Sequence, residues 1–329
     1  MSSPGMIEVY NLLRDQLHEL LYVGSSISAY SSSSPLREAH SWTVLKLCFL
    51  KLYIQRIYTP IIKNYYRNMF YIDLFAGSGL NQFKDYPDAL VPGSPIIAWS
   101  FAHRSFDYMF LVEKNLKHSR LLEERMKIIA LPEKFHVYHG GDANEEYISI
   151  IKKIEETPFS HFFAFIDPNV LEIKWRTLER LLTSKIRGDF LILFQGQYIA
   201  RMIGSILSGR VSEIPALNEF FGDNLWLKYV EDERKQGKRL GKAALEYYVG
   251  KIRKVRKRRE TIIEKVEVPL FKGLSYYLIF VTTKTLSENP WMGKVISLKK
   301  LIEKGDQKMV EYVISDVLGK PRSILSYLT

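Results

Sequence analysis

The fold class is decided by the apolar stretch MFYIDLF at residues 69–75 and by the turn Ala76-Gly77-Ser78-Gly79 that follows it. The stretch predicts a buried strand, and the glycines let the backbone of the turn approach a ligand where a Cβ atom would clash. The next residues exclude two nucleotide-binding motifs. A P-loop would continue with Gly-Lys-Ser/Thr, whereas Leu80-Asn81-Gln82 follows, and Gln82 stands where the dinucleotide fingerprint has a third small residue.

Strand-like and helical segments alternate after this turn. Strands are expected at residues 69–75, 108–113, 135–138, 161–167 and 190–194, with helices at 116–129, 145–154 and 178–186. Such alternation predicts a mostly parallel sheet with crossover helices. Two more strands are expected at 265–270 and 276–282, the last of them antiparallel. The predicted class is therefore α/β, with a Rossmann-like sheet.

Four regions surround and interrupt this pattern. We expect an N-terminal helical region at 1–68, broken by the serine-rich residues 25–34, and a sheet core at 69–207 and 265–285. A basic helical insertion is expected at 208–264 and a helical tail at 286–329. Residues 81–93 are expected to form a loop, after which Ser94 caps a helix that has Pro95 in its first turn.

Composition sets limits on the kind of protein. Cys48 is the one cysteine, which excludes a disulfide framework and a cysteine-rich zinc site and predicts a buried, inert thiol. The histidines predict no metal site. No secretory signal is visible, and apolar runs such as residues 190–194 are too short to span a bilayer. We therefore expect a cytoplasmic protein.

The positive charge is concentrated in one segment. The net charge is +11, and residues 234–259 alone hold twelve Lys/Arg against one acid, Glu246. A solvated lysine-rich face is one interpretation. A polyanion-binding surface is the other, because cations that neutralise phosphates release bound counterions. The predicted phosphate contacts are Lys235, Lys238, Arg239, Lys251, Arg253, Lys254, Arg256, Lys257 and Arg258.

Acidic residues accompany the ends of the first three strands, at the edge where open α/β sheets bind ligands. Glu113 is placed to bind both hydroxyls of a ribose, unless it is a surface acid. Asp142 can accept a hydrogen bond from an adenine amine, cap the next helix, or do both. The pattern Asp73-x-Phe-x-Gly-x-Gly resembles the S-adenosylmethionine loop of methyltransferases. The residues expected to contact this cofactor are Asp73, Phe75, Ala76, Gly77, Ser78, Gly79, Glu113, Asp142 and Ala143.

The fourth strand ends in Asp167-Pro168-Asn169, where amino-group methyltransferases have Asp/Asn-Pro-Pro-aromatic. In those enzymes the Asp side chain and the Pro carbonyl accept hydrogens of an exocyclic amine, and an aromatic ring stacks on the extruded base. Here Asn169 and Val170 replace the second half of the motif. Asp167 and Pro168 are the predicted catalytic residues, although Asp167 could be a structural acid. Trp175 and Tyr198 are candidates for stacking.

In sequence order, these motifs resemble those of the three-Cys-motif partner proteins. The likeness also includes Gly93-Ser94-Pro95, His40 and Lys46 before the first strand, Arg201 after the fifth, and the late strand 276–283. It implies a class I methyltransferase fold, an S-adenosylmethionine cofactor and a protein partner with an iron–sulfur cluster. The motif Ile166-Asp167-Pro168 is also similar to that of an rRNA adenine-N6 methyltransferase family.

Three functions remain open. The first is a methyltransferase that modifies an exocyclic amine of a nucleic-acid base, in RNA rather than DNA because modified RNA is the commoner substrate of such small chains. The second is a catalytically idle subunit that docks nucleic acid or a partner protein, since the Asp-Pro motif is incomplete. The third is a methyltransferase for protein or small molecules, in which case the basic segment would only be solvated.

Overall fold

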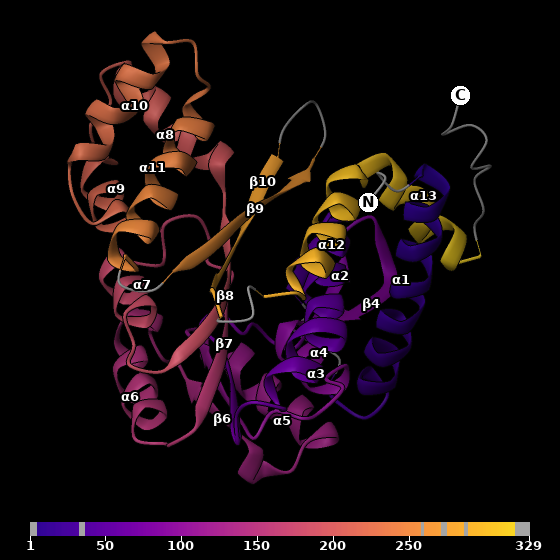
Figure 1. The fold of residues 1–329 in the computed structure, drawn as a ribbon. Coiled ribbons are helices and arrows are strands. Elements are labelled where there is room, and N and C mark those ends of the chain that lie inside the picture. The colour runs from indigo at the N-terminus through magenta and orange to yellow at the C-terminus, as the bar shows by residue number, and fades with distance from the viewer. Residues whose placement is uncertain (1–4, 33–36, 258–259, 271–274, 286–288, 320–329) are drawn as a thin grey trace.

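A seven-stranded sheet forms the centre of the molecule (Figure 1). The computed structural model describes residues 5–32, 37–257, 260–270, 275–285 and 289–319. The strand order is β6-β5-β2-β7-β8-β10-β9. In that order the strands are Phe135–His139, Tyr108–Glu113, Asn68–Asp73, Ser160–Ile166, Arg187–Phe194, Ser275–Thr283 and Thr261–Pro269. The first five run parallel, and β10 is antiparallel to both β8 and β9. This confirms the predicted Rossmann-like sheet, which is mostly parallel and has an antiparallel last strand.

The direction in which strands are added reverses at β2. The chain passes from β2 to β5 and β6 on one side and then returns to β7 on the other side. Strands β2 and β7 pair in parallel, with Asp73 opposite Phe165. Ligands of open α/β sheets bind at the carboxyl ends of the strands beside such a reversal. The glycine turn after β2 and the Asp167-Pro168 dipeptide after β7 therefore lie at neighbouring strand ends.

Helices cover both faces of the sheet, each over its own apolar core. One face carries α6 (Ala143–Glu155), α7 (Trp175–Leu182), α8 (Gly196–Leu207), α9 (Ile214–Phe221), α10 (Leu225–Lys235) and α11 (Leu240–Val255). The other carries α2 (Thr43–Tyr53), the π-helical segment Ile54–Tyr58, α3 (Thr59–Ile62), α4 (Ser94–Ser100), α5 (Leu116–Ile129), α12 (Met292–Lys304) and α13 (Gln307–Val317), with α1 (Met6–Ser28) outside them. A short 3-10 turn, Pro132–Lys134, precedes β6.

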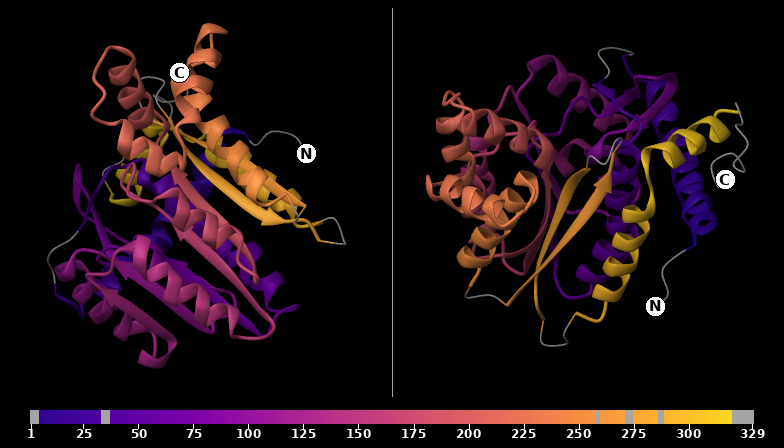
Figure 2. Two further views of the ribbon diagram at one scale, coloured as in Figure 1. Left: turned by 90° about the vertical axis from the view of Figure 1, so that its left-hand side faces the viewer. Right: turned by 90° about the horizontal axis from the view of Figure 1, so that it is seen from above.

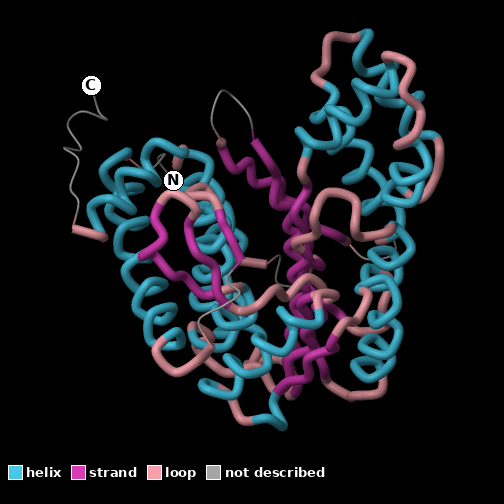
Figure 3. Tube along the Cα trace, turned by 180° about the vertical axis from the view of Figure 1, so that it is seen from behind, coloured by secondary structure: helices cyan, strands magenta, loops and turns pink. Residues whose placement is uncertain are grey.

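The expected loop at 81–93 is instead a β-hairpin. Strands β3 (Leu80–Phe83) and β4 (Tyr86–Pro92) pair with each other, and β1 (Arg37–Ala39) pairs with β3 in a separate three-stranded sheet. This small sheet lies apart from the main sheet, beside the N-terminal helices (Figure 3). The reason is packing against α1, which approaches β4 so closely that a Cβ on Gly24 would lie 2.1 Å from the Leu90 carbonyl oxygen. The N-terminal region is therefore not wholly helical.

Several other element ends differ from expectation, among them those of α7, which ends at Leu182 and not at residue 186, and of β8, which begins at Arg187 and not at residue 190. Helix α1 continues to Ser28, inside the serine-rich residues. Gly93 is the N-cap of α4, and Ser94 is its first helical residue. Strand β9 begins at Thr261, so the insertion ends before residue 264. Helix α8 was not anticipated, although its buried residues Ile199, Ile203 and Ile206 recur at helical spacing.

The basic insertion stands beside the carboxyl end of the sheet. Viewed from above, β9 and β10 run between the insertion helices on one side and α12 on the other (Figure 2). The side of the molecule towards which the parallel strands point is thus flanked by two helical layers. None of the helices in the described ranges combines the length and the apolar character that crossing a membrane requires.

Candidate functional site

A cavity of about 640 Å³ opens at the carboxyl ends of β2, β7 and β8. Its size is typical of a small-molecule site. Four parts of the chain line most of it: the small sheet, the segment before and within α2, the turn after β2 with the start of α4, and the ends of β7 and β8 together with the start of β10. The lining residues used below are His40, Trp42, Lys46, Phe75, Ala76, Gly77, Ser78, Gly79, Asp167, Pro168, Gln195, Tyr198, Arg201 and Tyr276.

The glycine turn lines the cavity in a conformation that favours glycine. Gly77 has φ 66° and Gly79 has φ 85°, in the left-handed region that costs other residues about 1–2 kcal/mol. Asp73 lies beneath this turn, fully buried, and does not line the cavity. It accepts hydrogen bonds from the Phe75 N–H at 3.2 Å and the Tyr71 hydroxyl at 3.0 Å. Asp73 therefore holds the turn in place.

Burial also changes the chemistry of Asp73. Removal from water raises the pKa of its carboxyl to about 7, although hydrogen bonds from Ser94, Phe75 and Tyr71 act in the opposite direction. Burial therefore favours the protonated form of this carboxyl. Its acid–base state is coupled to the shape of the turn, because the same oxygens accept the hydrogen bonds that fix it.

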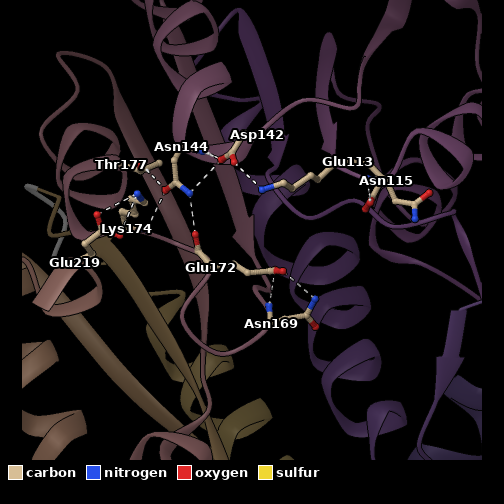
Figure 4. A network of polar contacts seen from close by, with 10 residues as sticks. Glu113, Asn115, Asp142, Asn144, Asn169, Glu172, Lys174, Thr177 and Glu219 are labelled. Carbon is tan, nitrogen blue, oxygen red and sulfur yellow. Dashed lines mark hydrogen bonds and ion pairs between the residues drawn. The ribbon is translucent and has the colours of Figure 1, made fainter. Parts of the chain in front are cut away.

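Glu113 and Asp142 lie beside the turn but not among the residues that line the cavity. The Gly77 N–H donates to one Glu113 oxygen at 2.9 Å, and the Asn115 N–H donates to the other at 2.7 Å. Asp142 caps α6 by accepting from the Asn144 N–H at 2.8 Å, which confirms the capping interpretation (Figure 4). Ala143 is buried in the first turn of that helix. Whether these residues also bind a nucleoside stays a prediction.

Asp167 and Pro168 face the cavity with part of their acceptor capacity already used. The Lys46 ammonium lies 2.5 Å from Asp167 Oδ2, and both side chains are largely buried. The Gln195 side-chain amide donates to the Pro168 carbonyl at 3.0 Å. No described residue donates to Asp167 Oδ1. One carboxylate oxygen and one carbonyl lone pair therefore remain for a ligand.

Asn169 shows why this motif lacks its second proline. Its backbone N–H donates to Glu172 Oε2 at 3.0 Å, and its side-chain amide donates to Oε1 at 3.3 Å (Figure 4). A proline has no N–H to give. The Asn144 amide in turn donates to the Glu172 carbonyl at 2.8 Å, which ties the loop after β7 to α6. Asn169 therefore shapes this loop through its two hydrogen bonds to Glu172.

Only one of the two proposed stacking residues is accessible. Trp175 is 4% exposed and packs edge-on against Tyr248, with the Lys251 ammonium 4.5 Å from its ring centroid. It is a core residue. Tyr198 lines the cavity and is 49% exposed. On the side of α2, the rings of His40 and Trp42 are stacked with centroids 4.0 Å apart.

The residues named by family resemblance gather at this cavity. His40, Lys46 and Arg201 all line it, together with Tyr276 from the late strand. Sequence reasoning from local patterns missed the contact between Lys46 and Asp167, since nothing near either residue signals it. Gln195 and Gln197 were also missed. A polar residue directly after a predicted strand was the available signal for both glutamines.

Three of the predicted phosphate-binding cations have buried or partly buried partners instead, and a fourth, Lys235, forms an exposed ion pair with Asp232 at 3.4 Å. Lys238 pairs with Glu233 and Glu246, and Lys251 pairs with Asp223 at 2.6 Å. Arg256 is 2% exposed and donates to the Leu182 carbonyl at 3.2 Å and to Thr283 at 2.6 Å. Their charges are satisfied within the fold. Tyr247 donates to Asp223 and Tyr248 is buried, so neither is free to stack on a base.

The exposed cations of this set lie at the two ends of α11. Arg239 precedes the helix, and Lys235 ends α10 just before it; both are exposed. The exposed residues Arg253, Lys254 and Lys257 lie at the other end. Thirteen helical residues, 240–252, lie between Arg239 and Arg253, so the two groups are about 21 Å apart along the helix axis. Arg258 lies outside the described residues. The basic segment is therefore two surfaces and not one.

The sequence predicts no metal site and a buried, inert thiol at Cys48. Within the described part of the chain, no three His, Cys, Asp or Glu side chains gather as metal ligands would. Cys48 is fully buried, and burial raises the pKa of its thiol to about 12. The expected inert thiol is confirmed.

Comparisons with known proteins give distant likenesses of fold. No protein-family model matches the chain, and no curated protein sequence matches it. A crystal structure of a Legionella pneumophila protein is similar at TM-score 0.44 and 13% identity, over 78% of this chain and 94% of that one. An O-methyltransferase from Bacillus cereus in complex with SAH is similar at TM-score 0.38 and 14% identity, over 82% and 91%.

Trm1 from Pyrococcus horikoshii, solved with S-adenosyl-L-methionine, is similar at TM-score 0.39 and 11% identity, over 74% of this chain and 55% of that one. These likenesses are too distant to transfer a substrate, a ligand or a residue role. What the site does is therefore argued from its own geometry.

Proposed function

We propose that the chain is an S-adenosylmethionine-dependent methyltransferase that acts on an exocyclic amine of a nucleic-acid base, in RNA rather than DNA. One observation carries the proposal. A single cavity joins the glycine turn after β2 to the Asp167-Pro168 dipeptide after β7. The first element is suited to the cofactor and the second to the amine. The iron–sulfur partner protein implied by family resemblance stays a prediction.

The residues present fit the cofactor. The turn at Gly77 and Gly79 offers backbone without side chains, in a conformation that a Cβ would strain. The Tyr276 hydroxyl is buried at the cavity with no hydrogen-bond partner among the described residues, so a polar ligand would satisfy it. S-adenosylmethionine, when bound, supplies a methyl group attached to a positively charged sulfur. Residues 75–79 would hold it, with Glu113 and Asp142 at the adjoining strand ends.

The unused acceptors beside β7 suit an exocyclic amine. The lone pair of such an amine is delocalised into the base, which makes the nitrogen planar and a poor nucleophile. Asp167 Oδ1 and the second lone pair of the Pro168 carbonyl would accept its two hydrogens. The nitrogen then becomes more tetrahedral, and its lone pair is directed away from the ring. Lys46 and Gln195 would hold these acceptors in position through the hydrogen bonds they already donate.

A second candidate function is a catalytically idle subunit that docks nucleic acid or a partner protein. The same contacts favour it. Lys46 already donates to Asp167, and Gln195 already donates to Pro168. If both acceptors served only these internal hydrogen bonds, the dipeptide would be a structural feature of the strand end. The two functions differ in one measurable respect, which is whether Asp167 is needed for methyl transfer.

The test is transfer of a labelled methyl group to unmodified RNA and to DNA, followed by digestion to nucleosides. We expect methylated nucleoside from RNA. For Asp167→Ala we expect a rate of methyl transfer at least 100-fold lower, which is the lower end of the effect of removing a side chain that acts on a proton of the reacting group. The matched control is Asp88→Ala, which removes an exposed acid on β4, away from the cavity. The circular dichroism spectrum of each variant, compared with that of wild type, checks that the variant is folded.

Three results would contradict parts of the proposal. Equal rates for wild type and Asp167→Ala would remove the role of the dipeptide. Methylation of DNA alone would show that the substrate is DNA and not RNA. No transfer to either polymer, by protein that binds nucleic acid, would favour the docking subunit.

A further inference from the structure

An exposed aromatic ring and an unpaired cation lie together at the mouth of the cavity. Tyr198 is in the first turn of α8, yet its side chain is 49% exposed. Arg201 follows one turn later on the same helix face, with its guanidinium carbon 4.5 Å from the centroid of the Tyr198 ring. No acidic side chain in the described ranges forms an ion pair with Arg201.

Two more cations lie at the start of α11, which contacts the start of α8. A Cβ on Gly241 would lie 2.8 Å from the Gly196 carbonyl oxygen, so α11 and α8 begin in direct contact. Arg239 and Lys242 flank Gly241 and are both exposed. Neither has an ion-pair partner within the part of the chain that the structure describes. Tyr198, Arg201, Arg239 and Lys242 are called the mouth strip below.

Charge distinguishes the two walls of the cavity. The wall formed by the small sheet carries Glu38 and Asp85 beside Lys84. On the opposite side Tyr198 and Arg201 line the cavity, and Arg239 and Lys242 lie outside its lining at the start of α11. No acid is paired to these three cations among the described residues. A phosphate backbone would therefore be attracted to the side of α8 and α11 and not to the side of the small sheet.

We propose that the mouth strip binds an unpaired, single-stranded segment of nucleic acid, with one base stacked on Tyr198 and phosphates on the three cations. This inference rests on the nucleic-acid part of the proposed function. In a duplex, the faces of the bases are covered by their neighbours, so a protruding tyrosine finds no face to stack on. Stacking on an aromatic ring combined with a basic groove is how single strands are bound without sequence preference. The cavity then receives the base next to the stacked one.

The test measures binding by fluorescence anisotropy, so it does not depend on methyl transfer. The probes are a labelled oligoribonucleotide of about 12 nucleotides, the same strand annealed to its complement, and the same backbone with an abasic site at each position. We expect wild type to bind the intact single strand at least tenfold more tightly than the duplex. Tyr198→Leu should lose roughly 10-fold in affinity for the intact strand and be unchanged on the abasic backbone, because stacking contributes about 1–3 kcal/mol per base.

Two further variants separate stacking from charge and from general effects. Arg201→Gln should reduce the slope of log K against log salt by about 0.7, the value for one phosphate contact on a single strand. Tyr22→Leu removes a tyrosine that is 76% exposed on α1, away from the cavity, and should bind like wild type. The inference is overturned if the duplex binds as tightly as the single strand, or if Tyr198→Leu binds the intact strand as wild type does. Failure of methyl transfer alone would leave it standing, because the proposed chemistry and this binding are measured separately.

Discussion

Lys46 Nζ and Asp167 Oδ2 lie 2.5 Å apart, in an ion pair that joins α2 to the residue after β7. The two positions are 121 residues apart in the chain. Their side chains are 13% and 9% exposed, so the pair is largely removed from water. Through this pair, a helix from the N-terminal region fixes the position of the Asp167 carboxylate at the cavity. That region is therefore part of the site and not an appendage to the sheet.

The first prediction concerns this pair. Lys46→Met keeps the apolar stem and removes the charge, which leaves the Asp167 carboxylate largely buried without its partner. We expect the free energy of unfolding to fall by about 3 kcal/mol, the range for breaking a buried ion pair. In a double-mutant cycle with Asp167→Asn, measured by urea unfolding, the two changes should be coupled by about 1–3 kcal/mol. Additive effects would mean that the pair does not form in solution.

The second prediction compares two buried tyrosines. The Tyr276 hydroxyl has no hydrogen-bond partner in the described structure, whereas the Tyr53 hydroxyl donates to Asp189 at 2.7 Å. Tyr276→Phe should therefore leave stability unchanged or raise it by about 1 kcal/mol, and Tyr53→Phe should lower it by about 1–2 kcal/mol. Thermal unfolding of both variants checks the contrast. A large loss for Tyr276→Phe would show that its hydroxyl is satisfied in the ligand-free protein.

The third prediction follows from the raised pKa of Asp73, about 7 in the folded chain against 3.8 for a free carboxyl. Between these values the folded state holds the proton more tightly than the unfolded state does. This group therefore contributes a decrease in stability as the pH rises from about 4 to 7. His161, whose pKa burial lowers to about 3, contributes the opposite slope. The whole-protein curve thus cannot isolate Asp73.

A difference measurement can isolate it. Urea unfolding of wild type and Asp73→Asn is compared at about pH 4.5 and about pH 7.5. The variant should gain stability relative to wild type at the higher pH, because its side chain has no charge to bury. Asp88→Asn, which changes an exposed acid, serves as the control. A difference that does not change with pH would place the pKa of Asp73 near its ordinary value.

The fourth prediction separates two neighbouring basic residues. Arg256 is buried, with its guanidinium bonded to Leu182 and Thr283 and lying 5.4 Å from the Phe190 ring centroid, whereas Lys257 is exposed. We expect Arg256→Met to lower the free energy of unfolding by about 2–4 kcal/mol. Lys257→Met should change it by less than about 0.5 kcal/mol. Chemical denaturation of both variants measures these changes. If both variants lose less than about 0.5 kcal/mol, Arg256 is not a structural residue and is again a candidate for phosphate binding.

The sheet was predictable because its signals are local. The apolar stretch that became β2, the glycines after it and the alternation of strands and helices each follow from a few neighbouring residues. The small sheet was missed for the opposite reason. Residues 80–92 contain prolines and charges that favour a loop, and only packing against Gly24 of α1 reveals why they form strands.

The site was predictable in its parts but not in its contacts. The glycine turn, Asp167 and Pro168 were placed by their position at strand ends, and the cavity does join them. That Asp73, Glu113 and Asp142 lie outside the cavity lining was not predictable, because it depends on the hydrogen bonds that the folded loops offer them. Composition could not distinguish buried Arg256 from exposed Arg253 either, since burial depends on the position of each residue around α11.

The central claim is that the glycine turn after β2 holds S-adenosylmethionine, and calorimetric titration with that cofactor tests it most directly. Gly77→Val adds a branched side chain at φ 66°, in the turn that lines the cavity. Gly250→Val is the control, because a Cβ there meets nothing within 4 Å. The account predicts micromolar binding by wild type and by the control, and affinity at least tenfold weaker for Gly77→Val. Well-folded wild type that binds no cofactor, or a Gly77→Val variant that binds as tightly as wild type, would contradict it.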